Sequence, residues 1–280
     1  MQRISTARRL SQIFLWMVPF FFWPLLVFVY RHSQSRSYLI GGAVQAGVML
    51  LAAWVLGASV IRKGSEDQRW LSLAGLLLVA PAIMISVFAG LGPPPREPER
   101  YLATAVDQEI RYTLLLFAGL FAAGGFAVLR ECLRQAGERI YSALGFAAII
   151  ISTALFVLYI TNDTIVIEAL RQRVGSGKMP EWWPPLRNHF TIVGVVEVAL
   201  TYLAIAAFAA ALRSVGWLGR IASWVLEGLS LIAVPLVALL PLYPSKLALP
   251  GFVLGIPAVP LVMPYLIGVN LLRRVGDPVT

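Results

Sequence analysis

Long apolar runs separated by short polar segments fill almost the whole chain. A helix needs about 20 apolar residues to cross a bilayer, and eight runs approach or exceed that length. The runs are continuously apolar, whereas strands of a membrane barrel would alternate in segments of about ten residues. They cover residues 13–30, 39–61, 70–92, 111–129, 141–160, 190–212, 217–240 and 248–272. The pattern predicts an all-α, polytopic integral membrane helix bundle of about eight transmembrane helices, forming one domain over residues 1–280.

Proline distinguishes the last run from the others. Pro250, Pro257, Pro260 and Pro264 each lack a backbone donor and interrupt the helical hydrogen-bond ladder. A kinked or broken last helix is therefore expected, and broken helices often line binding cavities in transporters. The alternative is a simple bend, because proline is common in membrane helices.

The first run resembles a signal peptide, because Arg3, Arg8 and Arg9 precede it. An h-region has about 7–15 residues and ends at a small-residue cleavage site. This run is longer and ends at Tyr30 and Arg31, so we interpret it as a retained first span.

Basic residues indicate the orientation. With the N-terminus in the cytoplasm, 13 of the 23 Lys and Arg residues fall in the short inner segments, and the other 10 are spread over longer outer segments. The inner set is Arg3, Arg8, Arg9, Arg62, Lys63, Arg69, Arg130, Arg134, Arg139, Arg213, Arg220, Arg273 and Arg274. This density favours an N-in, C-in topology.

Two outer loops exceed a simple turn, at about 93–110 and 161–189. In the first, Thr104 and Asp107 have the spacing of a helix-capping box. In the second, apolar and polar residues separate onto two faces over 164–174, which predicts a short helix lying at the membrane interface.

Two acidic residues, Glu197 and Glu227, lie deep inside predicted spans, where charge is costly and usually functional. Thr201 follows Glu197 by one helical turn, and Ser223 and Ser230 flank Glu227 on its own face. We expect the two carboxyls to differ in depth by about 8 Å, too far for a direct pair. They are either proton- or cation-linked coupling groups, or protonated acids that hydrogen-bond neighbouring helices as packing contacts.

The outer loops supply a second set of candidates. Asp107, Asp163 and His189 are the minimum for acid–base work at the membrane surface, provided that the fold brings them together. The Gly-Lys pair at Gly177 lacks the Ser/Thr and glycine spacing of a phosphate loop. We assign no catalytic residue, no metal ligand and no cofactor site from the sequence.

Composition sharpens the choice among functions. Charged residues make up 13% of the chain, hydrophobic residues 59%, and the mean hydropathy is +0.78. The excess of basic residues lies beside membrane spans and forms no separate domain, so the expected partners are lipids and not nucleic acid. One cysteine and two histidines exclude an intrachain disulfide and argue against haem or zinc chemistry.

The leading hypothesis is a multi-pass protein of a prokaryotic plasma membrane that binds or transports a small molecule or ion. Its coupling groups would be Glu197 and Glu227, and an enzymatic role is not favoured. One alternative is an accessory subunit of a larger membrane complex, with partner subunits or a second copy against its apolar surfaces. The other is a lipid-modifying enzyme whose site is formed by Asp107, Asp163 and His189.

Overall fold

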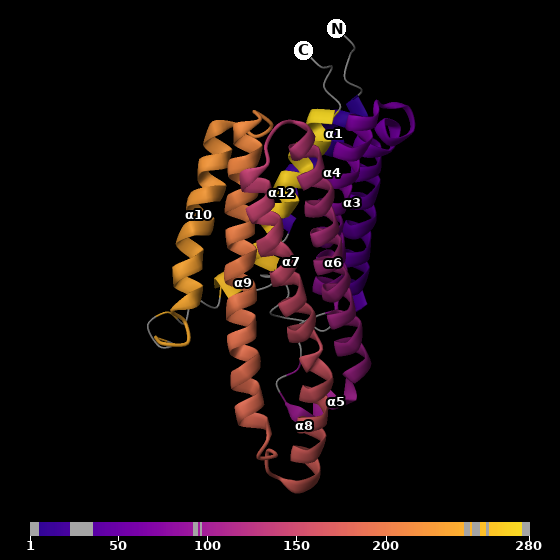
Figure 1. Cartoon of the computed structure of the whole chain (residues 1–280). Coiled ribbons are helices and arrows are strands. Elements are labelled where there is room, and N and C mark those ends of the chain that lie inside the picture. The colour runs from indigo at the N-terminus through magenta and orange to yellow at the C-terminus, as the bar shows by residue number, and fades with distance from the viewer. Residues whose placement is uncertain are drawn as a thin grey trace.

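The computed structural model describes residues 6–22, 36–91, 97–243 and 258–275, together with 95, 247 and 253–255. The described elements are helical and run along a common long axis (Figure 1). They are α1 (Thr6–Met17), the π-helical η1 (Val18–Phe22), α3 (Arg36–Lys63), α4 (Glu66–Gly90), α5 (Pro98–Ala103), α6 (Ala105–Gln135), α7 (Ile140–Ile160), α8 (Asn162–Ser176), α9 (Trp183–Ser214), α10 (Arg220–Ala238) and α12 (Ala258–Val275). The fold is the all-α membrane helix bundle that the sequence predicts.

The predicted number of spans is wrong. Within the described residues, six helices are long and apolar enough to cross a membrane, rather than eight. The first predicted run is helical over its described part, and that part ends at Phe22. The last is described as a helix only from Ala258, and Pro250 and Pro257 lie outside the described residues. Pro264 does lie inside α12.

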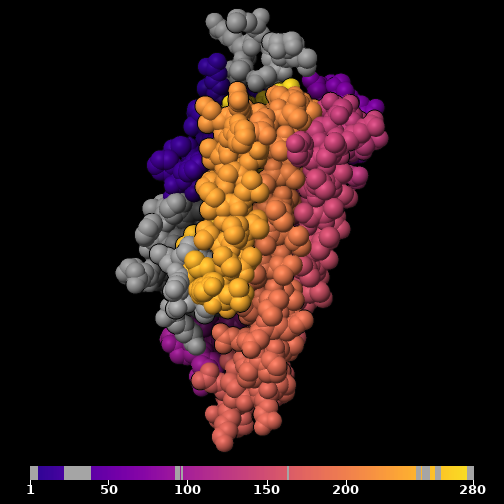
Figure 2. Space-filling model, turned by 60° about the vertical axis from the view of Figure 1, so that its left-hand side comes forward, coloured from indigo at the N-terminus to yellow at the C-terminus, as the bar shows by residue number. Residues whose placement is uncertain are grey.

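The two polar segments expected outside the membrane are largely helical. The first contains α5 and the start of α6, and the second contains α8 and the first turns of α9. Thr104 does not form the expected capping box, because its hydroxyl donates back to the Arg100 carbonyl, 3.0 Å away. After Thr161, α8 continues from α7, and together with the N-terminal part of α9 it projects beyond the other helices (Figures 1 and 2). The placement of α8 at a membrane interface stays a prediction.

Local sequence explains where several helices begin and end. Ser65 and Gln68 form a reciprocal capping box at the start of α4, followed by two acidic residues in its first turn. Gly137, Gly177 and Gly216 have positive φ angles at the ends of α6, α8 and α9, where a side chain would be strained. These glycines allow the chain to reverse in short connections.

One end of the bundle collects the basic segments. The connections α3–α4, α6–α7 and α9–α10 meet there, beside the start of α1 and the end of α12 (Figure 1). The Arg8 guanidinium joins three elements at this end, since it donates to the carbonyls of Leu56 and Leu272 at 3.4 and 3.5 Å. We call this the basic end, and the opposite end, with α5 and α8, the α8 end. Assignment of the basic end to the cytoplasm stays a prediction.

Helices α4, α6, α7, α9 and α12 form a ring of neighbours, and α12 bridges α4 and α9. Glycines permit the closest approach. A Cβ on Gly268 of α12 would lie 2.9 Å from the Gly75 carbonyl oxygen and 2.9 Å from the Leu78 Cβ of α4. Small residues at such crossings let two backbones touch, which is a main source of helix association in lipid.

The variant Gly268→Ala should therefore destabilise the bundle by about 1–3 kcal/mol, because the methyl group meets backbone atoms that cannot move aside. The matched control is Gly47→Ala in α3, where a Cβ would have no heavy atom within 4 Å. That change should leave stability equal or raise it by up to about 1 kcal/mol. Denaturant unfolding in detergent measures both, and equal effects would contradict the packing described for Gly268.

Orientation can be tested with single cysteines, since Cys132 is the only native one and Cys132→Ala removes it. Gly175→Cys lies at the exposed tip of α8, and Ala136→Cys lies exposed at the basic end. We expect a membrane-impermeant maleimide to label Gly175→Cys in intact cells, and Ala136→Cys only after permeabilisation. The reverse pattern would show that the basic end faces outward.

Candidate functional site

One face of α9 carries the polar residues of the site. Arg187, Thr191, Gly194, Glu197 and Thr201 follow at spacings of three or four residues, which places them in a single stripe along the helix. Proline at the first helical positions favours a helix start at Trp183, so α9 reaches 32 residues. That is about 48 Å of helix, longer than the roughly 30 Å hydrocarbon core.

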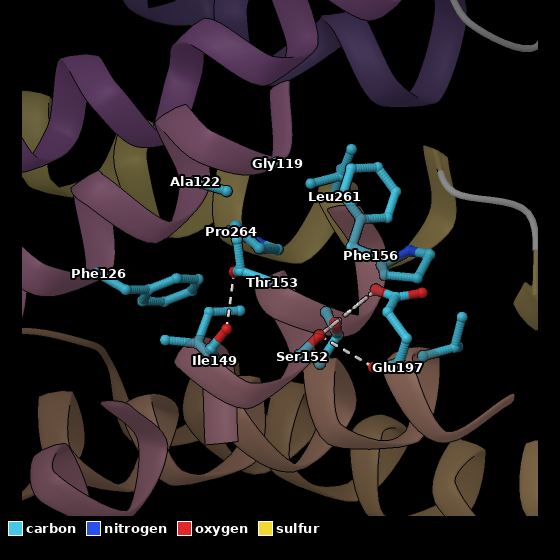
Figure 3. Close-up of a pocket in the computed structure, with 13 residues that line it drawn as sticks. Gly119, Ala122, Phe126, Ile149, Ser152, Thr153, Phe156, Glu197, Leu261 and Pro264 are labelled. Atoms are coloured by element: carbon cyan, nitrogen blue, oxygen red, sulfur yellow. Dashed lines mark hydrogen bonds between the residues drawn. The ribbon is translucent and has the colours of Figure 1, made fainter. Parts of the chain in front are cut away.

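The Glu197 side chain points toward α7 and contacts hydroxyl groups there and on α9 (Figure 3). Its Oε1 accepts from the Thr201 hydroxyl at 3.1 Å and lies 3.4 Å from the Ser152 hydroxyl. The two hydroxyl oxygens are 2.6 Å apart, and Ser152 Oγ is also 3.0 Å from the Glu197 carbonyl oxygen. Glu197, Ser152 and Thr201 thus form one polar cluster between two apolar helices.

This cluster can accommodate both protonation states of the carboxyl. Each hydroxyl has one proton and can also accept, so Ser152 and Thr201 can reverse the direction of their shared hydrogen bond. Among the described residues, no ion pair joins Glu197 to a basic side chain. An ionised Glu197 therefore keeps a net negative charge that hydroxyl groups alone offset.

Two cavities meet at Glu197. The inner cavity, about 40 Å³, lies among α6, α7, α9 and α12, and two of its wall residues are Pro260 and Pro264 of α12. A water needs at least about 10–15 Å³, so the inner cavity has room for a few waters or a small ion. The outer cavity, about 520 Å³, extends from Glu197 toward α8 and Arg187. Glu197, Phe156 and Val198 line both cavities.

The Phe156 ring, which lines both cavities, packs directly against a glycine. A Cβ on Gly119 of α6 would lie 2.6 Å from two atoms of the Phe156 ring, so only glycine leaves room for the ring as placed. In the same way, Gly194 of α9 faces the Tyr159 ring, which would lie 3.1 Å from its Cβ. Close ring-to-backbone packing therefore shapes both cavities.

The outer cavity has a mostly apolar wall with a few polar atoms. Its rings come from Tyr112, Phe156, Tyr159, Trp183 and Phe190, and aliphatic side chains fill the rest. The volume lies within the 300–1,000 Å³ that is typical of small-molecule sites. The site could therefore hold a ligand considerably larger than an ion.

Glu227 has a different environment from Glu197. Its Oε2 lies 3.2 Å from Nη2 of Arg213, and its Oε1 accepts from the Ser223 hydroxyl at 2.6 Å. The Ser223 oxygen is also 2.8 Å from the Ala209 carbonyl oxygen, and the Arg213 guanidinium lies 4.4 Å from the Trp224 ring centroid. Glu227 is thus charge-compensated within the α9–α10 hairpin. We interpret this arrangement as a structural ion pair.

The two glutamates lie at different depths, and neither cavity reaches both. The Ser223 contact sets Ala209 opposite Ser223, so Glu227 lies level with about residue 205, eight residues from Glu197. Eight residues correspond to about 12 Å along the axis, compared with the 8 Å expected from the sequence. Neither Glu227 nor Ser223 lines the inner or outer cavity. The hydroxyl of Ser230, the other predicted neighbour of Glu227, is buried and contacts the Met263 sulfur at 3.4 Å.

The outer-face candidates are not joined by any contact in the described structure. Asp107 on α6 and His189 on α9 are exposed, and neither lines the outer cavity. The side chain of Asp163 lies outside the described residues. No group of three or more His, Cys, Asp or Glu side chains suited to a metal ion occurs in the described part of the chain.

Several site residues were missed from the sequence. Ser152 and its neighbour Thr153 are hydroxyls in the middle of an otherwise apolar run, and that interruption was a usable signal. Arg213 was counted only as a topology signal, although an arginine at a helix end can extend along the helix toward a carboxylate on the next one. Nothing in the sequence pointed to Phe156.

Fold and site together define a multi-pass membrane protein with a carboxyl-containing cavity between its helices. Comparison with protein-family models, with curated proteins and with solved structures finds no match. The function must therefore be inferred from the geometry of the cavities.

The Arg213–Glu227 pair should show a favourable coupling in a double-mutant cycle. Glu227→Gln and Arg213→Gln each remove a charged hydrogen bond, and each should cost about 1.5–3 kcal/mol of stability. The double variant should lose less stability than the two single variants together, because it leaves neither charge unpaired. Denaturant unfolding of the four proteins measures the coupling. A coupling free energy near zero would contradict the interpretation of Arg213 and Glu227 as a structural ion pair.

Proposed function

We propose that the protein binds and transports a small molecule or ion, with Glu197 as its protonation-linked group. The supporting observation is that Glu197 has no described ion-pair partner and lines two cavities at once. A carboxylate between apolar helices is costly unless it gains a proton, a cation or water. The outer cavity supplies a route by which any of these reaches it.

The depth of Glu197 suits such a role. It lies 16 residues before Arg213 on α9, about 24 Å along the helix. If Arg213 marks one boundary of the roughly 30 Å hydrocarbon core, Glu197 lies near the opposite boundary, within reach of water through the outer cavity. Exchange of its proton is then possible from the α8 end.

A conformational step is needed for transport, and α12 offers a site for it. Pro264 has no N–H to donate to the carbonyl of Pro260, four residues earlier, and both residues line the inner cavity. Unpaired carbonyls of interrupted helices are a recurring feature of cation sites in transporters. Protonation of Glu197 would change the charge facing α12 and so favour one arrangement of the kink over another.

The membrane is proposed to be a prokaryotic plasma membrane, with the basic end against its anionic cytoplasmic leaflet. The apolar outer faces, such as that of α10 with Ile221 and Ile232, are then covered by lipid. A role as an accessory subunit would instead cover part of this surface with a partner helix. The cavities favour transport, because a subunit that only packs against partners needs no carboxyl in a water-sized space.

The proposal predicts selective chemistry at Glu197. Dicyclohexylcarbodiimide, an apolar reagent, reacts with protonated carboxyls, so it should modify Glu197 and leave the ion-paired Glu227 intact. Modification should fall as the pH rises, because the reactive species is the protonated acid. Peptide mass spectrometry measures both sites in one sample.

Glu197→Gln provides the blank for this experiment, and the exposed Glu168 on α8 controls for general reactivity. Absence of modification at Glu197 at every pH, or equal modification of Glu227, would contradict the proposed function.

A further inference from the structure

We infer that the outer cavity binds a lipophilic organic cation, an ammonium group attached to an aromatic or aliphatic body. This inference rests on the proposed function and names the class of ligand for the same site. It is drawn from the Glu197 carboxyl, which has no described cation partner, from the aromatic rings of the cavity wall, and from the position of Arg187, the basic residue among the described residues of that wall.

The acidic group in the described wall of the outer cavity is the carboxyl of Glu197. The carboxyl of Glu197 is contacted by hydroxyl groups but by no described cation. A ligand that brings a positively charged N–H donor can therefore form a charge-assisted hydrogen bond with this carboxyl.

The negative charge of Glu197 and the aromatic rings of the wall favour a cationic ligand over a neutral hydrogen-bond donor. An ammonium group compensates the Glu197 carboxylate, whereas a neutral donor does not. Phe156 and Tyr159 stand beside Glu197 in the wall, and aromatic faces attract ammonium groups. The remaining volume is lined by Trp183, Phe190 and aliphatic side chains, which suit an apolar body.

Arg187 is the basic residue among the described residues of this wall. It is exposed, and it precedes Glu197 by ten residues, about 15 Å along α9. At that distance from the carboxyl, its charge is solvated and screened. An anionic ligand would instead need Arg187, so this residue separates the two ligand classes experimentally.

The experiment uses isothermal titration calorimetry on the purified full chain in detergent with three probes of similar size. They are 4-phenylbutylammonium, the neutral 4-phenylbutanol and the anionic 4-phenylbutanoate. We expect saturable binding of the ammonium probe, weaker binding of the alcohol and no binding of the carboxylate. Stronger binding of the carboxylate than of the ammonium probe would overturn the inference.

Variants assign the binding to the cavity. Glu197→Gln should lower the affinity for the ammonium probe by about tenfold or more, as expected for loss of a charged contact. Glu168→Gln, a matched change on the exposed surface of α8, should leave the affinity within about twofold. Arg187→Gln should leave the affinity for the ammonium probe equal or raise it, because it removes a positive charge from the cavity wall, and a lower affinity in this variant would contradict the inference.

Carbodiimide protection separates this inference from the proposed function. Saturating 4-phenylbutylammonium should protect Glu197 from modification several-fold. If Glu197 is modified in a pH-dependent manner but the ammonium probe neither binds nor protects it, the ligand class is wrong and the proposed function stands. If Glu197 is never modified, the proposed function itself fails. Unchanged unfolding midpoints of the variants show that a lost affinity is not a lost fold.

Discussion

A charge placed in hydrocarbon must find a partner, and this constraint organises the polar interior of the protein. Water is absent from the bilayer core, so each buried ionisable group is paired, neutralised or placed beside a hydrated cavity. The two glutamates inside the helices meet this requirement in different ways. Glu227 is paired with Arg213, and Glu197 lies at the junction of two cavities. One carboxyl is thus held in an ion pair between two helices, and the other faces a cavity.

The site also depends on the close approach of the helix backbones around it. Helices α6, α7, α9 and α12 must approach closely enough for small polar contacts to close between them, and glycines at their crossings allow this. Two glycines without side chains, Gly119 and Gly194, also leave room for the Phe156 and Tyr159 rings. Glycine thus fixes the position of two of the rings that line the cavities.

Hydrophobic length was enough to predict the class of fold, but not how the helices face one another. The runs at 70–92 and 141–160 correspond closely to α4 and α7, because continuous apolar sequence can only be helical in lipid. A helix that is apolar all round has no preferred face, so its rotation is set by neighbours distant in sequence. Ser152 and Glu197 are 45 residues apart, and their contact depends on that rotation. The polar helical turns before residue 190 of α9 carry no continuous apolar signal and were therefore expected as part of a loop.

The length of α9 has a consequence for local stability. About 18 Å of this helix exceeds the thickness of the hydrocarbon core, by the lengths of about 48 and 30 Å given above. Amide hydrogens in lipid are shielded from water, while those in the projecting turns near Trp183 face solvent on at least one side. Backbone amides along this one helix should thus exchange with deuterium at rates that differ by orders of magnitude, with a step near Glu197. The position of that step would locate the water boundary within the protein directly.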